Sequence, residues 1–479
     1  MKNQFSIKYN HKDIYIYICI LLFFYPLLLN DFIFSDNGRS HIVGCNFNRF
    51  IDALITFRPL ANLSECAERI IIYNLKIYSL IKFLNILIII FIYYLLKKIF
   101  QSPLIKYSLI FFITSSGIVF WVSNGIHGTL TLISIILAIK SFNKVNNKIL
   151  SGLFLLLSMS ISPVIYTFVF VLLFLSIFEE KKYYSFIKNF LFFIFIIFLY
   201  IFIIKIILIS FDLSFPKTTS LDYSPIPGIS LEKIIFKFKL FYQNIFTNFL
   251  YNKNFFNTLV FPLISIGIFF LSFLTVYLNI YEYFVKKFYI KKYLTAFLSI
   301  IITSVFTIIF LIISMAPFLV SNLNVLVPHQ ILPFFGFFIF SGLNTSYKNL
   351  QNFIIKSSII IYFLIFVTSY NDILKKISNS FNFYVESTTI YIDEKIYLKK
   401  NLLWNIDNFK YNSYYENPNE YFIGLTLKLL KINKIKKKFD ICLNVASCSE
   451  TNVHILVGSE NDVKKSGKIK NYFVIDTKY

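Results

Sequence analysis

Arginine is scarce in this 479-residue sequence, which relies on lysine for almost all of its positive charge. The four arginines are Arg39, Arg49, Arg58 and Arg69, and residues 31–74, which contain all of them, hold no lysine. A guanidinium binds phosphate or carboxylate through two parallel hydrogen bonds, whereas a lysine ammonium is a point charge on a flexible stem. The segment therefore indicates a site for an anionic group; ordinary ion pairs with neighbouring acidic residues are the alternative interpretation.

Several motifs of soluble enzymes are also missing. The sequence has no glycine-rich phosphate-binding loop, no Cys-x-x-Cys pair and no nucleophile elbow, so ATP-driven transport and serine hydrolysis have no support. Charged residues make up only 15% of the chain and hydrophobic residues 57%, with a mean hydropathy of +0.67. This composition excludes an ordinary soluble protein and is typical of a polytopic membrane protein.

Long apolar runs predict about eleven membrane-spanning segments, because roughly 20 apolar residues cross the hydrocarbon of a bilayer. The expected segments are 14–34, 77–96, 104–122, 127–140, 149–162, 163–178, 186–209, 257–280, 293–315, 330–345 and 353–370. Lysines cluster in alternate connections: Lys97–Lys98, Lys140 to Lys148, Lys181–Lys182, Lys286 to Lys292, and Lys348. Lysine accumulates on the cytoplasmic side, so these connections and the amino terminus are expected there. The net charge of +23 then reflects topology, and no nucleic-acid partner is expected.

The stretch 148–178 decides the topology downstream of it. It is either one long helix or two short segments that meet on the outer side. Ser162–Pro163 lies in its middle, and proline removes a backbone donor and disfavours helix in the residue before it. Two segments also preserve the lysine alternation, so we expect two.

The chain changes character near residue 371, where polar residues increase. Alternating patterns at Thr388–Tyr397 and Val453–Val457 predict short strands. We therefore expect an all-α polytopic membrane domain over 1–370, with a first outer loop at about 31–76, and a small α+β extracytoplasmic domain over 371–479. Cys19 is expected to be inert packing within the first span. The other cysteines form two pairs on the expected outer side, where disulfides and free thiols are both compatible with the sequence: Cys45 with Cys66, and Cys442 with Cys448.

The first outer loop combines acidic, basic and amphipathic elements at the membrane boundary. Asp31 and Asp36 follow the first span, and Arg39 comes three residues after Asp36. Apolar residues at helical spacing over 47–55 predict a short helix on the outer leaflet, with Arg49 on its polar face. Carboxylates and arginines at a membrane surface suit a substrate that is half lipid and half polar, such as a prenyl-phosphate sugar.

Two runs of this loop share a pattern with a known family: Asp36-x-Gly38-Arg39-Ser40 with Gly44 after it, and Phe57-Arg58-Pro59-Leu60-Ala61. The pattern resembles the first outer loop of the type-II O-antigen glucosyltransferases, serotype-converting membrane enzymes of the C-type glycosyltransferase superfamily. The match covers about 35 residues. Ser35 stands where the family has the first Asp of a pair, and Phe57 stands where it has Gly.

The resemblance implies an enzyme that moves a sugar, glucose in the family, from a polyprenyl-phosphate donor to a cell-surface polysaccharide such as O-antigen. Asp36 would then be the general base of an inverting attack, and Asp31 the candidate replacement for the missing carboxylate. Arg39 and Arg58, with Arg49 nearby, would bind the lipid phosphate. The expected location is the plasma (inner) membrane, with a cytoplasmic amino terminus and an extracytoplasmic carboxyl-terminal domain.

His127 and His329 lie in other expected outer loops and are candidates for contacts with phosphate or sugar; interfacial histidines bonded to backbone are the alternative. No cofactor is clearly indicated, although Asp31 and Asp36 as ligands of Mg²⁺ or Mn²⁺ stay open. A polymerase or ligase of lipid-linked glycans is the rival enzyme. A flippase or transporter of lipid-linked sugars is the rival of another class, and it predicts charged residues within the spans.

Overall fold

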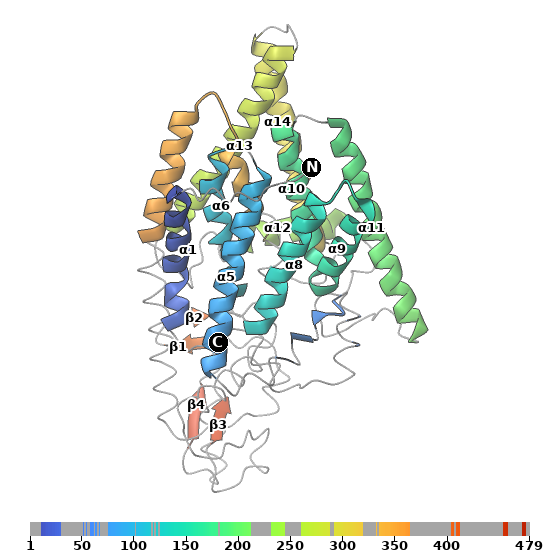
Figure 1. The fold of residues 1–479 in the computed structure, drawn as a ribbon, viewed down its shortest axis with the longest axis vertical. Helices are drawn as coiled ribbons and strands as arrows, with labels where there is room; N and C mark the ends of the chain where they lie inside the picture. The colour runs from blue at the N-terminus through green and yellow to red at the C-terminus, as the bar shows by residue number, and fades with distance from the viewer. Residues whose placement is uncertain are drawn as a thin grey trace.

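The structure is a computed structural model, and nearly all of its described residues are helical (Figure 1). It describes residues 11–29, 75–100, 102–115, 125–180, 183–211, 231–244, 260–287, 292–319 and 335–364, single positions between 51 and 67 and at 118, 121, 122 and 332, and four short strands after residue 403. The expectation of a mostly helical membrane domain is confirmed.

The described elements follow one another in this order: α1 (His11–Leu29), α5 (Leu75–Ile99), α6 (Ile105–Ile113), α8 (Gly125–Asn143), α9 (Lys148–Ile161), η1 (Pro163–Ile165), α10 (Tyr166–Glu180), α11 (Tyr183–Ser210), α12 (Leu231–Asn244), α13 (Val260–Lys287), α14 (Lys292–Leu319), η3 (Phe337–Gly342), a helix over 348–364, β1 (Trp404–Ile406), β2 (Phe409–Tyr411), β3 (His454–Val457) and β4 (Tyr472–Ile475).

Five helices in the described part of the chain are long and apolar enough to cross a membrane, so the protein is a multi-pass membrane protein. They span Ser79–Ile99, Gly125–Asn143, Ser185–Ser210, Leu263–Lys286 and Lys292–Ser314. The expected number of eleven is not reproduced. The expected span 104–122 contains α6, which ends at Ile113 after nine residues, and the expected span 330–345 contains the 3₁₀ helix η3. Most residues of α6 and all residues of η3 are buried among other helices.

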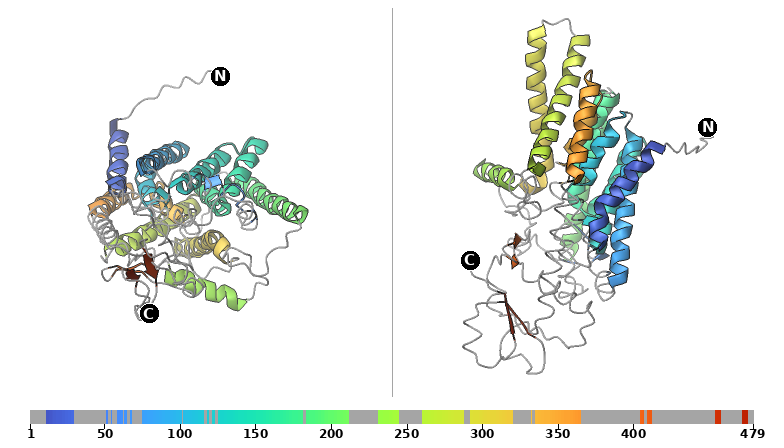
Figure 2. Two further views of the ribbon diagram at one scale, coloured as in Figure 1. Left: turned by 90° about the horizontal axis from the view of Figure 1, so that it is seen from below. Right: turned by 90° about the vertical axis from the view of Figure 1, so that its left-hand side faces the viewer.

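The lysine-rich helix ends gather at one end of the bundle (Figures 1 and 2). α5 ends there, α8 and α9 are joined there, and α13 and α14 are joined there. The start of the helix over 348–364 belongs to the same end, because the Ser346 amide donates to the Glu282 carboxylate at 3.1 Å, near the end of α13. The alternation expected from the lysines is therefore present in the arrangement of the described helices.

The stretch 148–178 forms two helices of opposite direction. Lys148 Nζ donates to Asn189 Oδ1 at 2.8 Å, and the Tyr200 hydroxyl donates to the Met159 carbonyl at 3.2 Å. The two contacts advance together along the chain, so α9 and α11 run parallel. The break falls at Ser162, whose extended backbone (φ −143°, ψ 100°) ends α9.

Ring contacts show that α10 runs the opposite way to α11. The Phe174 and Phe186 rings are 5.4 Å apart between centroids, and the Phe170 and Phe190 rings are 5.2 Å apart. From the first pair to the second, the residue number falls by four in α10 and rises by four in α11. α10 is therefore antiparallel to α11 and to α9, and the expectation of two short segments is confirmed.

The core of the bundle is rich in phenylalanine. α10 lies at its centre, and the residues from Phe168 to Leu175 are all buried. Rings from three elements meet there: Phe174 of α10, Phe310 of α14, and Phe337 and Phe340 of η3, with centroid separations of 5.0 to 6.5 Å. Offset and edge-on ring pairs of this kind add to the packing energy of a core.

One further segment contains a helix that the sequence analysis did not name, and one cysteine differs from its expectation. The connection 212–256 contains the amphipathic helix α12, drawn in Figure 2. Lys237 of this helix is buried. Cys19, expected as inert packing, is an exposed free thiol. Cys45, Cys66, Cys442 and Cys448 lie outside the described residues.

The described strands after residue 403 form two pairs. β1 and β2 are antiparallel, and β3 and β4 are parallel with His454 opposite Tyr472. β3 confirms the strand expected at Val453–Val457, whereas 388–397 and most of 371–479 lie outside the described residues.

Candidate functional site

Two of the expected site residues, Arg58 and His127, lie in the described part of the chain. The others lie outside it: Asp31, Asp36, Arg39, Arg49 and His329. Of the surface helix expected over 47–55, Ile51 and Leu54 are described, and both are helical with Leu54 buried.

Arg58 begins a tight turn that is docked on the end of α9. The Ala61 amide donates to the Arg58 carbonyl at 2.9 Å, and the Leu60 amide donates to the Ser160 carbonyl at 2.9 Å. Ser160 lies in the last turn of α9, where carbonyls lack partners within the helix. The helix break at Ser162 therefore exposes an acceptor that the turn uses, and the two features position each other.

The side chain of Arg58 lies close to Tyr200 of α11. Its guanidinium is near enough to act electrostatically on the Tyr200 hydroxyl, and its Nε atom is buried. The Tyr200 side chain is buried and its hydroxyl is held by Met159. A positive charge is thus fixed where α9 ends and only partly exposed to water, a setting that strengthens attraction for an anion.

His127 is connected to the same turn through Ser64. Its Nδ1 lies 2.9 Å from the Ser64 Oγ, and its ring centroid is 5.4 Å from that of Trp121. Ser64 Oγ donates its single proton to the Ala61 carbonyl at 2.5 Å, so it accepts from His127 Nδ1–H. In the neutral imidazole the lone pair is then on Nε2, which makes Nε2 the atom suited to accept a proton or a hydrogen bond.

A buried amide holds the start of α8, and with it His127, in place. Asn85 Nδ2 donates to the Gly125 carbonyl at 3.0 Å and to the Val122 carbonyl at 3.2 Å, and its Oδ1 accepts from Thr129 at 2.6 Å. Gly125 has a positive φ of 53°, which glycine adopts without strain. Asn85 therefore fixes a backbone turn that only a few residue types would tolerate.

Lys82 is a buried cation that the sequence reading missed. It is 1% exposed and lies one helical turn before Asn85 on α5. Residues three apart share a helix face, so Lys82 lies on the face that packs toward the start of α8. In the sequence, Lys82 is a lone lysine inside an apolar segment. Because lysine is almost never fully buried without a partner, such a position indicates a polar contact inside the bundle.

Three side chains with functional chemistry therefore lie at the end of the bundle opposite the lysine clusters: the cations Arg58 and Lys82, and the imidazole of His127. Ser64 contacts His127, Asn85 holds the start of the helix that carries His127, and Tyr200 lies near Arg58. The sequence analysis named none of these three. Among the residues that the structure describes, no group of three His, Cys, Asp or Glu side chains is placed to hold a metal ion. The Asp31 and Asp36 carboxylates lie outside those residues.

Compared with known proteins, the chain matches no family model, and no curated protein or solved structure is similar to it at a significant level.

Proposed function

We propose that the protein is a membrane glycosyltransferase that moves a sugar from a polyprenyl-phosphate donor to a hydroxyl of a cell-surface polysaccharide such as O-antigen. Glucose is the first candidate for the sugar. The observation that supports this most is the placing of Arg58, which the sequence resemblance marks as a phosphate ligand. It lies partly buried in a turn docked on α9, next to Tyr200 and connected to His127 through Ser64.

In the proposed reaction, the acceptor hydroxyl oxygen attacks the anomeric carbon of the donor with inversion. The bond between that carbon and the phosphate oxygen breaks, and the lipid phosphate leaves with the electron pair. Asp36 takes the proton of the acceptor hydroxyl, with Asp31 as a second carboxylate in the same loop. Arg39 and Arg58 stabilise the charge of the departing phosphate, and Arg49 and Lys82 add positive potential. His127 and His329 contact phosphate or sugar.

The proposed orientation follows from the positive-inside bias. With the lysine-rich end of the bundle in the cytoplasm, Arg58 and His127 are on the outer side of the plasma (inner) membrane. The amino terminus is then cytoplasmic and residues 371–479 are extracytoplasmic. A polyprenyl-phosphate sugar presented at the outer leaflet and a polysaccharide acceptor would both reach that end.

The test is transfer of labelled sugar from undecaprenyl-phosphate glucose in membranes that contain the full chain. Arg58→Lys keeps the charge and removes the paired hydrogen bonds, so we expect transfer to fall about 10- to 100-fold, a loss of roughly 1.4–2.7 kcal/mol. Asp36→Asn should abolish transfer. Asp372→Asn, a carboxylate outside the first outer loop, is the matched control and should leave transfer unchanged.

Normal transfer by Asp36→Asn at equal protein level would refute Asp36 as the base. No transfer by the unmodified chain, with this and other lipid-linked sugars, would favour a flippase or transporter of the same lipids. The observation that favours a transporter is Lys82, a buried charge inside the α5 span, because transporters place charged residues within their spans. Chain extension of a lipid-linked glycan would indicate a polymerase or ligase.

A further inference from the structure

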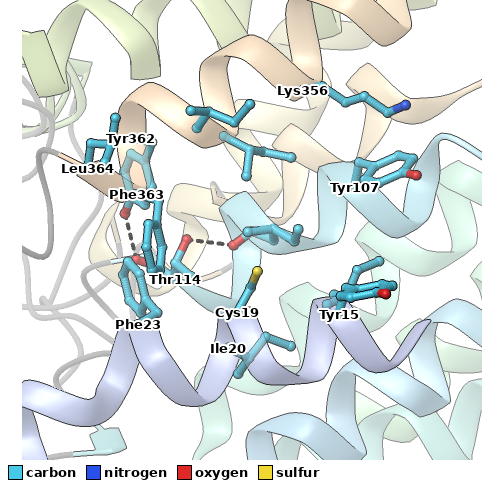
Figure 3. A pocket seen from close by; sticks show the side chains of 14 residues that line it. Tyr15, Cys19, Ile20, Phe23, Tyr107, Thr114, Lys356, Tyr362, Phe363 and Leu364 are labelled. Carbon is cyan, nitrogen blue, oxygen red and sulfur yellow. Dashed lines mark hydrogen bonds between the residues drawn. The ribbon is translucent and has the colours of Figure 1, made fainter. Parts of the chain in front are cut away.

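A second candidate binding site lies on the opposite half of the bundle, between α1, α6 and the helix over 348–364. It is a groove with a cavity volume of about 330 Å³ (Figure 3). Its lining is almost wholly apolar and includes Cys19 and Ile20 of α1, Ile110 of α6, and Ile359 and Phe363 of the last helix. This groove is independent of the site around Arg58.

Tyr362 closes the inner end of the groove. Its hydroxyl donates to the Thr114 carbonyl at 2.8 Å (Figure 3). Its ring stacks on Phe23 with centroids 6.0 Å apart and meets the edge of Phe111 at 6.1 Å. The three helices are therefore joined at this end, and the groove is a formed feature of their packing rather than a loose gap.

The walls of the groove continue into a surface that faces the bilayer. Ile18 and Leu22 of α1 are exposed, as are Phe353, Ile360 and Leu364 of the last helix. Large apolar side chains exposed along both helices are expected where a helix contacts lipid rather than protein. A hydrocarbon chain can therefore enter the groove sideways from the membrane.

Two ammonium groups lie beside the Tyr107 ring, which lines the groove at the lysine-rich end; Lys356 also lines the groove, and Lys106 is the sequence neighbour of Tyr107. Lys106 Nζ lies 5.0 Å and Lys356 Nζ 5.1 Å from the centroid of the Tyr107 ring (Figure 3 shows Lys356 and Tyr107). Both lysines lie over the Tyr107 ring, and within the part of the chain that the structure describes neither forms an ion pair with a carboxylate. Two positive charges beside one neutral ring raise the local positive potential, which attracts an anion such as a phosphate.

The length of the groove matches one leaflet. From Lys356 to Leu364 the helix rises by about 1.5 Å per residue, or roughly 12 Å in all. One leaflet contributes about half of the roughly 30 Å hydrocarbon thickness of a bilayer. The groove thus has charge at the level of the headgroups and apolar lining for the depth that an acyl chain occupies.

We propose that this groove binds an anionic diacyl phospholipid of the leaflet at the lysine-rich end. One acyl chain lies along Cys19, Ile110 and Ile359, and the phosphate lies between Lys106 and Lys356. Tyr362 sets the depth at which the chain ends. Cys19 is exposed because it is part of the wall that contacts the lipid.

The test is native mass spectrometry of the purified full chain, incubated with equal amounts of phosphatidylglycerol and phosphatidylcholine that have the same acyl chains. We expect one phosphatidylglycerol to be retained at least about fivefold more than phosphatidylcholine. In the double variant Lys106→Gln with Lys356→Gln, that ratio should fall close to one. Lys144→Gln removes an exposed lysine at the same end of the bundle, away from the groove, and should leave the ratio unchanged.

Filling the groove tests the acyl-chain part separately. Cys19→Phe should abolish retention of both lipids, whereas Ile18→Phe, on an exposed position of the same helix outside the lining, should not. Equal retention of the two lipids by the unmodified chain would overturn the proposal. So would selectivity that survives the double lysine variant, or displacement of phosphatidylglycerol by a lower concentration of undecaprenyl phosphate.

Discussion

α10 and α11 are neighbours in sequence and in space, and both are almost entirely apolar, yet they lie in different surroundings. α10 is buried on all sides over Phe168–Leu175. α11 buries one face, which includes Phe193 and Tyr200, and exposes the other, which includes Phe195, Phe198 and Phe202. The exposed positions recur every three or four residues, which is the spacing of one helix face.

The difference shows how little hydrophobicity says about position inside a membrane protein. Lipid tails are as apolar as leucine, so the lipid-facing surface and the interior select the same residues. What separates them is close packing. Gly152 of α9 illustrates this, because a Cβ placed there would lie 3.0 Å from the Ile196 Cδ1 on the buried face of α11.

Glycine-to-alanine changes should separate interior from lipid-facing positions most strongly. At Gly342 of η3, an added Cβ would lie 2.6 Å from Ser108 Oγ and 2.7 Å from the Ile105 Cα, and backbone cannot move aside cheaply. We expect Gly342→Ala to destabilise the protein by about 3 kcal/mol, the upper end for overpacking. Gly267→Ala, with nothing within 4 Å of the new Cβ, should be neutral. Thermal unfolding in detergent checks both, and equal midpoints would contradict the packing of η3 on α6.

Phenylalanine truncation sharpens the comparison between the two helices. Phe168 of α10 stacks on Phe112 with centroids 5.0 Å apart and is fully buried, whereas Phe198 of α11 is 66% exposed. Phe168→Ala should cost roughly 2 kcal/mol, below the about 3–5 kcal/mol of a soluble core because lipid rather than water is the alternative environment. Phe198→Ala should change stability by less than about 0.5 kcal/mol. A larger effect at Phe198 would show that α11 packs against protein on that face.

Polar side chains in the interior give the smallest expected effect. Asn85→Ala would leave the Gly125 and Val122 carbonyls without their donor, at a cost of about 1 kcal/mol given the modest measured strength of hydrogen bonds inside membranes. Asn85 positions the start of α8, which carries His127. The same variant should therefore lower sugar transfer by more than the loss of folded protein explains. Asn146→Ala, at an exposed turn, is the control for both measurements. Full activity in Asn85→Ala would remove His127 from the proposed site.

The sequence predicted the helical class, the lysine-bearing ends and the break at Ser162–Pro163, because each depends on local chemistry. The number of spans stays a prediction: five of the described helices are long enough to cross a membrane, whereas α6 and η3 are short and mostly buried among other helices. The sequence analysis missed α12, because an amphipathic helix between polar segments has the composition of a loop. For the site it named Arg58 and His127, but not Ser64, Asn85, Tyr200 or Lys82.

These four residues were missed for a common reason. A serine, an asparagine, a tyrosine or a lysine acquires a role only through what it contacts, and Ser64 and His127 are 63 positions apart. Residue types alone established that the chain is a membrane protein, that lysine and arginine occupy different connections, and where proline ends α9. Tertiary packing decided which apolar faces meet protein and which meet lipid, and which distant polar groups become neighbours. Hydropathy and helix breaking are local properties, whereas van der Waals contact and hydrogen bonding between helices depend on the completed fold.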